Sequence, residues 1–264
     1  MSRRVACVLN SSLISRKIPY RVLLPDAYDS STRTFPVLYL LHGLFGSFEN
    51  WTDLTGLDGY VDDFPMIVVM PDAGDSWYTD RVEGEAYESY LVGELIPEIE
   101  AGFRASGERS QRLIAGNSMG GYGAFKLALK HRDLFALAGS FSGAFHAPKL
   151  NGTEDNTNWD ELGPSITNVF GDMDETVRWA NYLDSILEQY PKTKVPDLPY
   201  LYLDCGKQDG FIFANREMDL IFGNAGIRHE FHELEGGHDW RYWDDRIRHF
   251  LEFAAFKFEL MSPE

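Results

Sequence analysis

The chain has few cysteines, few basic residues and no long hydrophobic run, and each shortage excludes a class of protein. It contains only Cys7 and Cys205, too few for a disulfide framework. Its 24 lysines and arginines stand against 41 aspartates and glutamates, which gives a net charge of −17. Because nucleic-acid binding depends on basic residues that neutralise phosphates, this balance argues against nucleic-acid partners and against anionic membrane surfaces. No run approaches the roughly 18 apolar residues that a membrane-spanning helix needs.

The sequence also lacks a metal-ligand pattern and a secretory leader. No histidines, cysteines and carboxylates have the spacing of a metal site, so we expect neither a metal nor another cofactor. The segment Ser2-Arg3-Arg4 superficially resembles a twin-arginine signal, but the apolar stretch after it ends at Asn10 without a cleavage site. We therefore expect a cytoplasmic protein, with an already trimmed mature chain as the alternative.

Length and pattern indicate a single α/β domain over 1–264. This length would allow one large domain or two, but no linker, repeat or low-complexity segment divides the chain. Apolar strand-like runs alternate with helical patterns, which is typical of a mainly parallel sheet with helices on both faces. The runs 4–9 and 18–24 are expected to form an antiparallel pair at the sheet edge. Helices are expected over 85–103, 120–130, 176–189, 211–224 and 240–258.

The most informative segment is 113–124, Leu-Ile-Ala-Gly-Asn-Ser-Met-Gly-Gly-Tyr-Gly-Ala. It consists of a short apolar strand, a Gly-x-Ser-x-Gly motif and the start of an amphipathic helix. This order is the nucleophile elbow of the α/β-hydrolase fold, in which a sharp turn exposes a serine at the top of the sheet. Gly116 and Gly120 are needed because the strand and helix backbones pack too closely there for side chains. The motif predicts Ser118 as the nucleophile.

The acid and the histidine of a catalytic triad should follow in that order, each on a loop after a later strand. The apolar run 199–204 is followed by a glycine-containing loop that carries Asp209. A second strand-like run, 229–234, leads into a loop with His238, just before the C-terminal helix. Asp204 is the competing acid, but a carboxylate at a strand end usually bonds nearby backbone. We therefore predict Asp209 as the acid and His238 as the base.

These roles predict acyl-transfer chemistry. Ser118 would attack a carbonyl carbon while His238 takes its proton, and Asp209 would hold the imidazole in the correct tautomer. The tetrahedral oxyanion needs two preorganised N–H donors. One should be the backbone N–H of Met119, which follows the nucleophile, and the other that of Leu44, on the loop after the expected third strand.

With these residues in view, the chain resembles the esterase D-like branch of the α/β-hydrolases. That branch includes S-formylglutathione hydrolases, tributyrin-type esterases, feruloyl and acetylxylan esterases of carbohydrate esterase family 1, and antigen 85 mycolyltransferases. Ser-Met-Gly-Gly at 118–121 and Gly-His-Asp-Trp at 237–240 are specific to this branch in combination. The resemblance begins at 18–25 and covers most of the chain. It implies the α/β-hydrolase fold, serine chemistry and an oxyanion hole at Leu44 and Met119.

The stretch 144–197 resembles no one member closely enough to indicate a substrate. We expect it to form a small cap between the sixth and seventh strands. The candidate substrate-binding residues are aromatic, and the alternative for each is that it only packs the fold together. They are Trp77 and Tyr78 after the fourth strand, Trp159 in the cap, and Trp240 near the base.

The sequence thus predicts a serine carboxylesterase that hydrolyses acetyl, butyryl or feruloyl-type esters, including carbohydrate-linked ones, through an acyl-enzyme. The expected partner is a small-molecule ester, and the sequence gives no oligomeric state. A thioesterase of the S-formylglutathione type is one alternative, although an acidic chain makes an anionic glutathione conjugate less favourable. Acyl transfer to an alcohol is another. A non-catalytic binding protein on a hydrolase fold is the alternative of a different class, and the intact triad argues against it.

Overall fold

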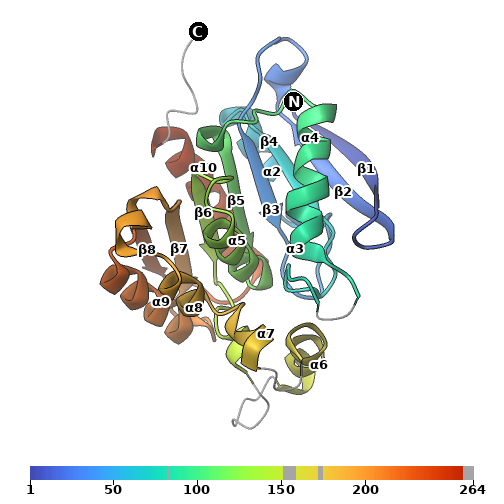
Figure 1. Ribbon diagram of the computed structural model, residues 1–264. Helices are drawn as coiled ribbons and strands as arrows, with labels where there is room; N and C mark the ends of the chain where they lie inside the picture. Colours follow the sequence, from blue (N-terminus) through green and yellow to red (C-terminus); the bar gives the residue numbers. More distant parts are fainter. Residues whose placement is uncertain (82–83, 151–158, 172–174, 258–264) are drawn as a thin grey trace.

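A computed structural model describes residues 1–81, 84–150, 159–171 and 175–257 of the chain. Its framework is one eight-stranded sheet (Figure 1). The strands are β1 (Arg3–Ser11), β2 (Arg16–Leu24), β3 (Val37–Leu41), β4 (Ile67–Pro71), β5 (Arg112–Asn117), β6 (Leu137–Phe141), β7 (Tyr200–Gly206) and β8 (His229–Leu234). Their spatial order is β1-β2-β4-β3-β5-β6-β7-β8.

The six strands from β3 to β8 pair in parallel, while β1 and β2 form an antiparallel hairpin that joins the sheet through β4. The expected mainly parallel sheet with an antiparallel pair at its edge is therefore confirmed. Strands β3 to β6 are buried along their whole length, because helices cover both faces of the sheet. Strand β1 instead alternates exposed and half-buried residues, as an edge strand does.

Helices surround the sheet on both faces. The α-helices are α1 (Asn50–Leu54), α2 (Leu57–Asp63), α3 (Tyr87–Tyr90), α4 (Ile96–Gly102), α5 (Met119–Lys130), α6 (Trp159–Phe170), α7 (Glu175–Trp179), α8 (Leu183–Glu188), α9 (Ile212–Ala225) and α10 (Trp240–Lys257). A π-helical turn (Leu91–Leu95) joins α3 to α4. Short 3-10 turns span Asp26–Tyr28, Arg109–Gln111, Ala147–Lys149 and Lys192–Asp197.

The sheet separates two hydrophobic cores. Alternate side chains of β3 point to opposite faces, so Tyr39 belongs to one core and Leu40 to the other. The core on the Tyr39 side is completed by α3, α4, α5 and α9, and the core on the Leu40 side by α1, α2 and α10. In Figure 1 the two groups of helices lie in front of and behind the sheet.

The segment between β6 and β7 contains α6, α7 and α8, and its outer part lies beyond the ends of the strands (Figure 1). The single helix expected over 176–189 is wrong, because α7 ends at Trp179 and α8 begins at Leu183. Two features interrupt it. The Asn181 side-chain Nδ2 donates to the Val177 carbonyl (2.9 Å), and Tyr182 has an extended backbone with φ −74° and ψ 134°.

Strand β7 carries a buried carboxyl group that faces α10. Asp204 is fully buried, and its Oδ1 accepts a hydrogen bond of 3.0 Å from the Tyr242 hydroxyl. Its Oδ2 has no partner among the described residues. Burial raises the pKa of Asp204 to about 8, although the Arg246 guanidinium opposes the shift. The folded state therefore favours the neutral acid.

We predict that Asp204→Asn weakens the pH dependence of stability. Because the folded pKa lies above the ordinary aspartate pKa, the wild type loses free energy of unfolding as pH rises between the two values. The slope from one such group is at most about 1.4 kcal/mol per pH unit. Asparagine keeps an acceptor for Tyr242 and has no titrating proton. Urea unfolding of both proteins at about pH 5 and about pH 8 measures the slopes, and equal slopes would contradict the assignment.

Candidate active site

Ser118 lies at the turn from β5 into α5, in a backbone conformation that L residues rarely adopt (φ 54°, ψ −116°). The turn requires two glycines because backbones meet there. A Cβ on Gly116 would lie 2.6 Å from the carbonyl carbon of Gly120, and a Cβ on Gly120 would lie 2.5 Å from the carbonyl oxygen of Leu41. The turn holds the Ser118 side chain at the end of the sheet and at the N-terminus of the helix.

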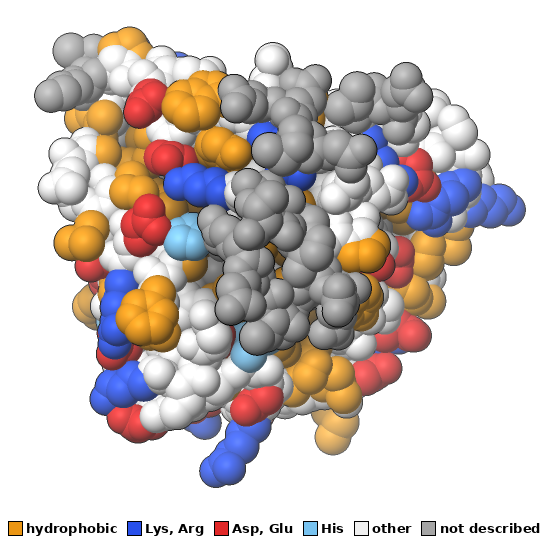
Figure 2. All heavy atoms as spheres, turned by 90° about the horizontal axis from the view of Figure 1, so that it is seen from below, with side chains coloured by type: hydrophobic (Ala, Val, Ile, Leu, Met, Phe, Trp, Pro, Cys, Tyr) orange, Lys and Arg blue, Asp and Glu red, His pale blue; other side chains and the backbone are white. Residues whose placement is uncertain are grey.

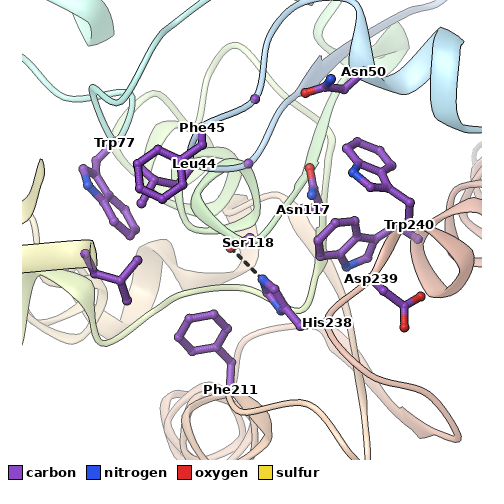
Figure 3. A pocket seen from close by; sticks show the side chains of 14 residues that line it. Leu44, Phe45, Asn50, Trp77, Asn117, Ser118, Phe211, His238, Asp239 and Trp240 are labelled. Atoms are coloured by element: carbon purple, nitrogen blue, oxygen red, sulfur yellow. Dashed lines mark hydrogen bonds between the residues drawn. The ribbon is translucent and has the colours of Figure 1, made fainter. Parts of the chain in front are cut away.

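The structure brings Ser118, Asp209 and His238 together from three separate loops. His238 Nε2 lies 3.0 Å from Ser118 Oγ, as the dashed line in Figure 3 marks. His238 Nδ1 lies 2.9 Å from Asp209 Oδ2, and Asp209 Oδ1 accepts the Phe211 backbone N–H at 2.8 Å. A carboxylate can only accept, so it places the imidazole proton on Nδ1. Nε2 is then free to accept the hydroxyl proton of Ser118.

The two aspartates near the end of β7 have opposite electrostatic environments. Burial alone would raise the pKa of Asp209, but hydrogen bonds from His238 and from the Phe211 N–H outweigh it and hold the pKa below its ordinary value. Asp204 bonds Tyr242 instead and has its pKa raised by burial. The geometry therefore favours Asp209 over Asp204 as the partner of the histidine.

A buried histidine fixes the loop that carries Leu44. His42 Nδ1 lies 2.8 Å from the Gly43 carbonyl, and its Nε2 accepts the backbone N–H of Ala73 at 3.0 Å. The bond from Ala73 joins the loop after β3 to the loop after β4. Burial lowers the pKa of His42, so the ring is neutral and can accept at Nε2.

Leu44 and Met119 carry the two backbone N–H groups that are expected to form the oxyanion hole. Met119 is the first residue of α5, and Leu44 lies on a loop held by the hydrogen bond from the Phe45 N–H to Asp75 Oδ1 (2.9 Å). Among the described residues, no acceptor takes the N–H of Leu44 or of Met119. Both groups are therefore available to a bound ligand.

A cavity of about 530 Å³ opens at Ser118. In Figure 3 an apolar group, Leu44, Phe45 and Trp77, lies on one side of the serine, and a more polar group, Asn50, Asn117 and Trp240, on the other. We call these the apolar side and the polar side. The remaining described lining residues are Gly43, Gly46, Leu162 of α6, Phe211, His238, Asp239 and Trp243.

Charge is nearly absent from this cavity. Asp239 is the one carboxylate among the described lining residues, and they include neither lysine nor arginine. Asp239 Oδ1 accepts the Tyr242 backbone N–H at 3.0 Å and so caps α10. The site therefore offers aromatic and amide contacts in place of an ion-pairing group.

Only some of the residues that were predicted to bind substrate line the described cavity. Trp77 and Trp240 line the cavity. Tyr78 does not, so the prediction that it binds substrate is wrong for the described site: its ring is fully buried, and its hydroxyl donates to the His42 carbonyl at 3.0 Å. The side chain of Trp159 lies outside the described residues.

Sequence reasoning missed several lining residues. Asn117 directly precedes Ser118, and Phe45 directly follows Leu44. Their positions next to predicted site residues could have indicated them. Asn50 and Phe211 belong to no motif. Trp243 also lines the cavity, and its ring packs edge-on against the His238 ring with the centroids 4.9 Å apart.

Neither metal ligation nor membrane insertion finds support in the described part of the chain. No group of three or more histidine, cysteine, aspartate or glutamate side chains there could hold a metal ion. None of its helices is both long and apolar enough to cross a bilayer. Among the side chains that the structure describes, hydrophobic, acidic and basic ones are interspersed on the face that carries α6 and α7 (Figure 2).

Known proteins share both the sequence pattern and the fold. A family model described as putative esterase matches residues 11–253. Esterase Rv1288 of Mycobacterium tuberculosis is 34% identical over 244 residues, which cover 83% of this chain and 52% of that protein. An acetyl esterase of Caldicellulosiruptor saccharolyticus is 29% identical over 229 residues, which cover 86% of each chain. The chain thus spans about half the length of the Mycobacterium relative.

Several solved structures of serine hydrolases and esterases have the same fold as this chain. FphF of Staphylococcus aureus, a fluorophosphonate-binding serine hydrolase, is 26% identical with a TM-score of 0.84, covering 96% of this chain and 98% of its own. A ferulic acid esterase is 28% identical with a TM-score of 0.81 and the same coverage. The S-formylglutathione hydrolase FrmB of Staphylococcus aureus is 26% identical with a TM-score of 0.79, covering 96% and 99%. The chain has the α/β-hydrolase fold and belongs to the putative esterase family.

Proposed function

We propose that this protein is a serine carboxylesterase that hydrolyses short acyl or aryl esters through an acyl-enzyme. One observation carries the proposal. Asp209, His238 and Ser118 form a continuous hydrogen-bonded series, and its nucleophilic end opens into the cavity. Membership of an esterase family and similarity to acetyl and ferulic acid esterases support the same chemistry.

The geometry supports the following reaction. Ser118 Oγ attacks the ester carbonyl carbon and gives its proton to His238 Nε2, while Asp209 stabilises the imidazolium. The Leu44 and Met119 N–H groups bind the oxyanion. The imidazolium then protonates the departing alcohol oxygen, which leaves an acyl ester on Ser118. A water molecule, deprotonated by His238, attacks this ester, and collapse releases the acid and restores the serine.

The two sides of the cavity suggest how an ester lies in it. Leu44, Phe45 and Trp77 offer apolar and aromatic contacts, which suit a short acyl chain or an aryl group. Asn50 and Asn117 offer amide groups, which suit a hydroxylated alcohol. Asn117 is almost fully buried beside the cavity, and its Oδ1 has no partner among the described residues. We therefore place the acyl or aryl group on the apolar side and the alcohol on the polar side.

S-formylglutathione is the second candidate substrate, because FrmB is a neighbour of similar sequence identity. Glutathione conjugates carry more carboxylates than amines, and a site for them is expected to offer a basic residue. The described lining residues offer none, and Asp239 would repel the ligand. The cavity thus favours uncharged esters.

We predict that Asp209→Asn and Asp204→Asn separate the two candidate acids. Asp209→Asn should lower kcat for p-nitrophenyl acetate by about 10⁴-fold, because the amide favours the wrong imidazole tautomer. Asp204 lies on β7, before the loop that carries Asp209, and is bonded to Tyr242, so Asp204→Asn should keep kcat close to that of the wild type. Steady-state kinetics of both variants decide the matter, and the reverse result would move the acid to Asp204.

We predict that turnover depends on Ser118 and favours uncharged esters. The wild type should hydrolyse p-nitrophenyl acetate, butyrate and ferulate with kcat/KM at least about tenfold above its value for S-formylglutathione. Ser118→Ala should abolish all four activities and leave the circular dichroism spectrum unchanged. Turnover of S-formylglutathione alone would establish the thioesterase instead. Activity that survives in Ser118→Ala would refute the triad.

A further inference from the structure

Trp77, on the apolar side of the cavity, lies in a strained turn. Trp77 and Tyr78 both have left-handed backbone conformations, with φ of 53° and 52°. For a residue other than glycine this conformation is strained, and it persists only where the surrounding structure imposes it. Some contact must therefore hold these two consecutive residues in place.

Besides the bonds of the Trp77 and Tyr78 side chains themselves, one such contact comes from Lys126 on α5. The Lys126 side chain is fully buried, and its Nζ donates to the Tyr78 carbonyl and to Thr79 Oγ1, each at 2.7 Å. Thr79 Oγ1 in turn donates to the Trp77 carbonyl at 2.9 Å. Lys126 Nζ also lies 3.0 Å from Glu88 Oε2. The ammonium group thus has two partners on the turn and one carboxylate.

Pairing with Glu88 alone does not explain the position of Lys126. The same carboxylate is also bound by Lys130 at 2.8 Å and by His131 at 3.0 Å, both closer to solvent. Burial lowers the pKa of Lys126 to about 8, although Glu88 opposes the shift, so the ammonium form still prevails at neutral pH. A buried cation is costly unless its donors are used, and here the turn uses two of them.

Trp77 connects the turn to the cavity, which its side chain lines, and to α6, with which it forms a hydrogen bond. Its indole N–H donates to Ser165 Oγ of α6 at 3.1 Å. Its ring packs against the rings of Tyr122 and Phe170, with centroids at 6.0 and 6.3 Å. Helix α5, which holds Ser118 at its N-terminus, therefore also fixes the cavity wall through Lys126.

We propose that Lys126 is a positioning residue that sets acyl selectivity, because it clamps the Trp77–Thr79 turn and so fixes the Trp77 side of the cavity. The inference rests on the proposed esterase function. Lys126 does not line the cavity and acts only through the turn. It should therefore affect how well a large aryl group fits far more than it affects the reaction at Ser118.

Lys126→Met tests the proposal, with Lys130→Met as its matched control. Lys130 binds the same Glu88 carboxylate from the same helix but makes no contact with the turn. We expect Lys126→Met to lower the ratio of kcat/KM for p-nitrophenyl ferulate to that for p-nitrophenyl acetate by about tenfold or more, mainly through KM for the ferulate. Lys130→Met should keep the wild-type ratio. An unchanged ratio in Lys126→Met, or an equal fall in both variants, would overturn the proposal.

Two further measurements cover other outcomes. If Lys126→Met does not fold, Thr79→Val removes the bond to the Trp77 carbonyl, keeps the buried ion pair, and should lower the same ratio. Hydrogen exchange of the backbone amides of 76–80 needs no turnover. Exchange should be faster in Lys126→Met than in wild type and Lys130→Met. If Lys126→Met does not fold, the same comparison is made with Thr79→Val. If the wild type hydrolyses no ester, the proposed function fails, and exchange still decides whether Lys126 clamps the turn. Unchanged exchange would show that it does not.

Discussion

The close approach of the β5 and α5 backbones is the constraint on which the site depends. Side chains at Gly116 or Gly120 would overlap backbone atoms of the neighbouring segments, so the strand turns into the helix within one residue. That residue is Ser118, and the fold compensates its strained backbone with hydrogen bonds. Its N–H donates to the Phe141 carbonyl at 2.9 Å, and its carbonyl accepts the N–H of Ala144 at 3.1 Å. These bonds hold the Ser118 backbone in the turn, as the proposed preorganised reaction requires.

Burial and hydrogen bonding together decide which ionisable groups near the site are charged. Burial acts to raise the pKa of both Asp204 and Asp209. Only Asp209 receives enough donors to stay ionised, and this is the carboxylate that contacts the histidine. Lys126 differs, because burial lowers its pKa to about 8 in spite of Glu88, and the ammonium form prevails at neutral pH only because the ordinary lysine pKa is high. Of these three buried groups, Asp209 is the one whose polar partners outweigh desolvation.

Local patterns allowed much of this structure to be predicted from the sequence, and non-local geometry limited the rest. The elbow and the parallel strands follow from short motifs with a direct physical cause, and the loop position of His238 follows from the strand before it. Trp77 and Tyr78 are adjacent aromatic residues, and the sequence does not reveal the two left-handed conformations of the turn in which Trp77 lines the cavity and Tyr78 does not. The interruption after Trp179 depends on a side-chain hydrogen bond that periodicity does not reveal. Asn50 reaches the cavity from α1, far from any motif.

The central claim is that Ser118 carries the acyl group during turnover, and acid-quench mass spectrometry tests it most directly. The protein is mixed with p-nitrophenyl butyrate, quenched in acid within the first turnovers and digested. We expect a butyryl adduct on the peptide that contains Ser118, and a larger yield of it when p-nitrophenol release shows a burst. An adduct on another residue, or burst release with the Ser118 peptide unmodified, would contradict it.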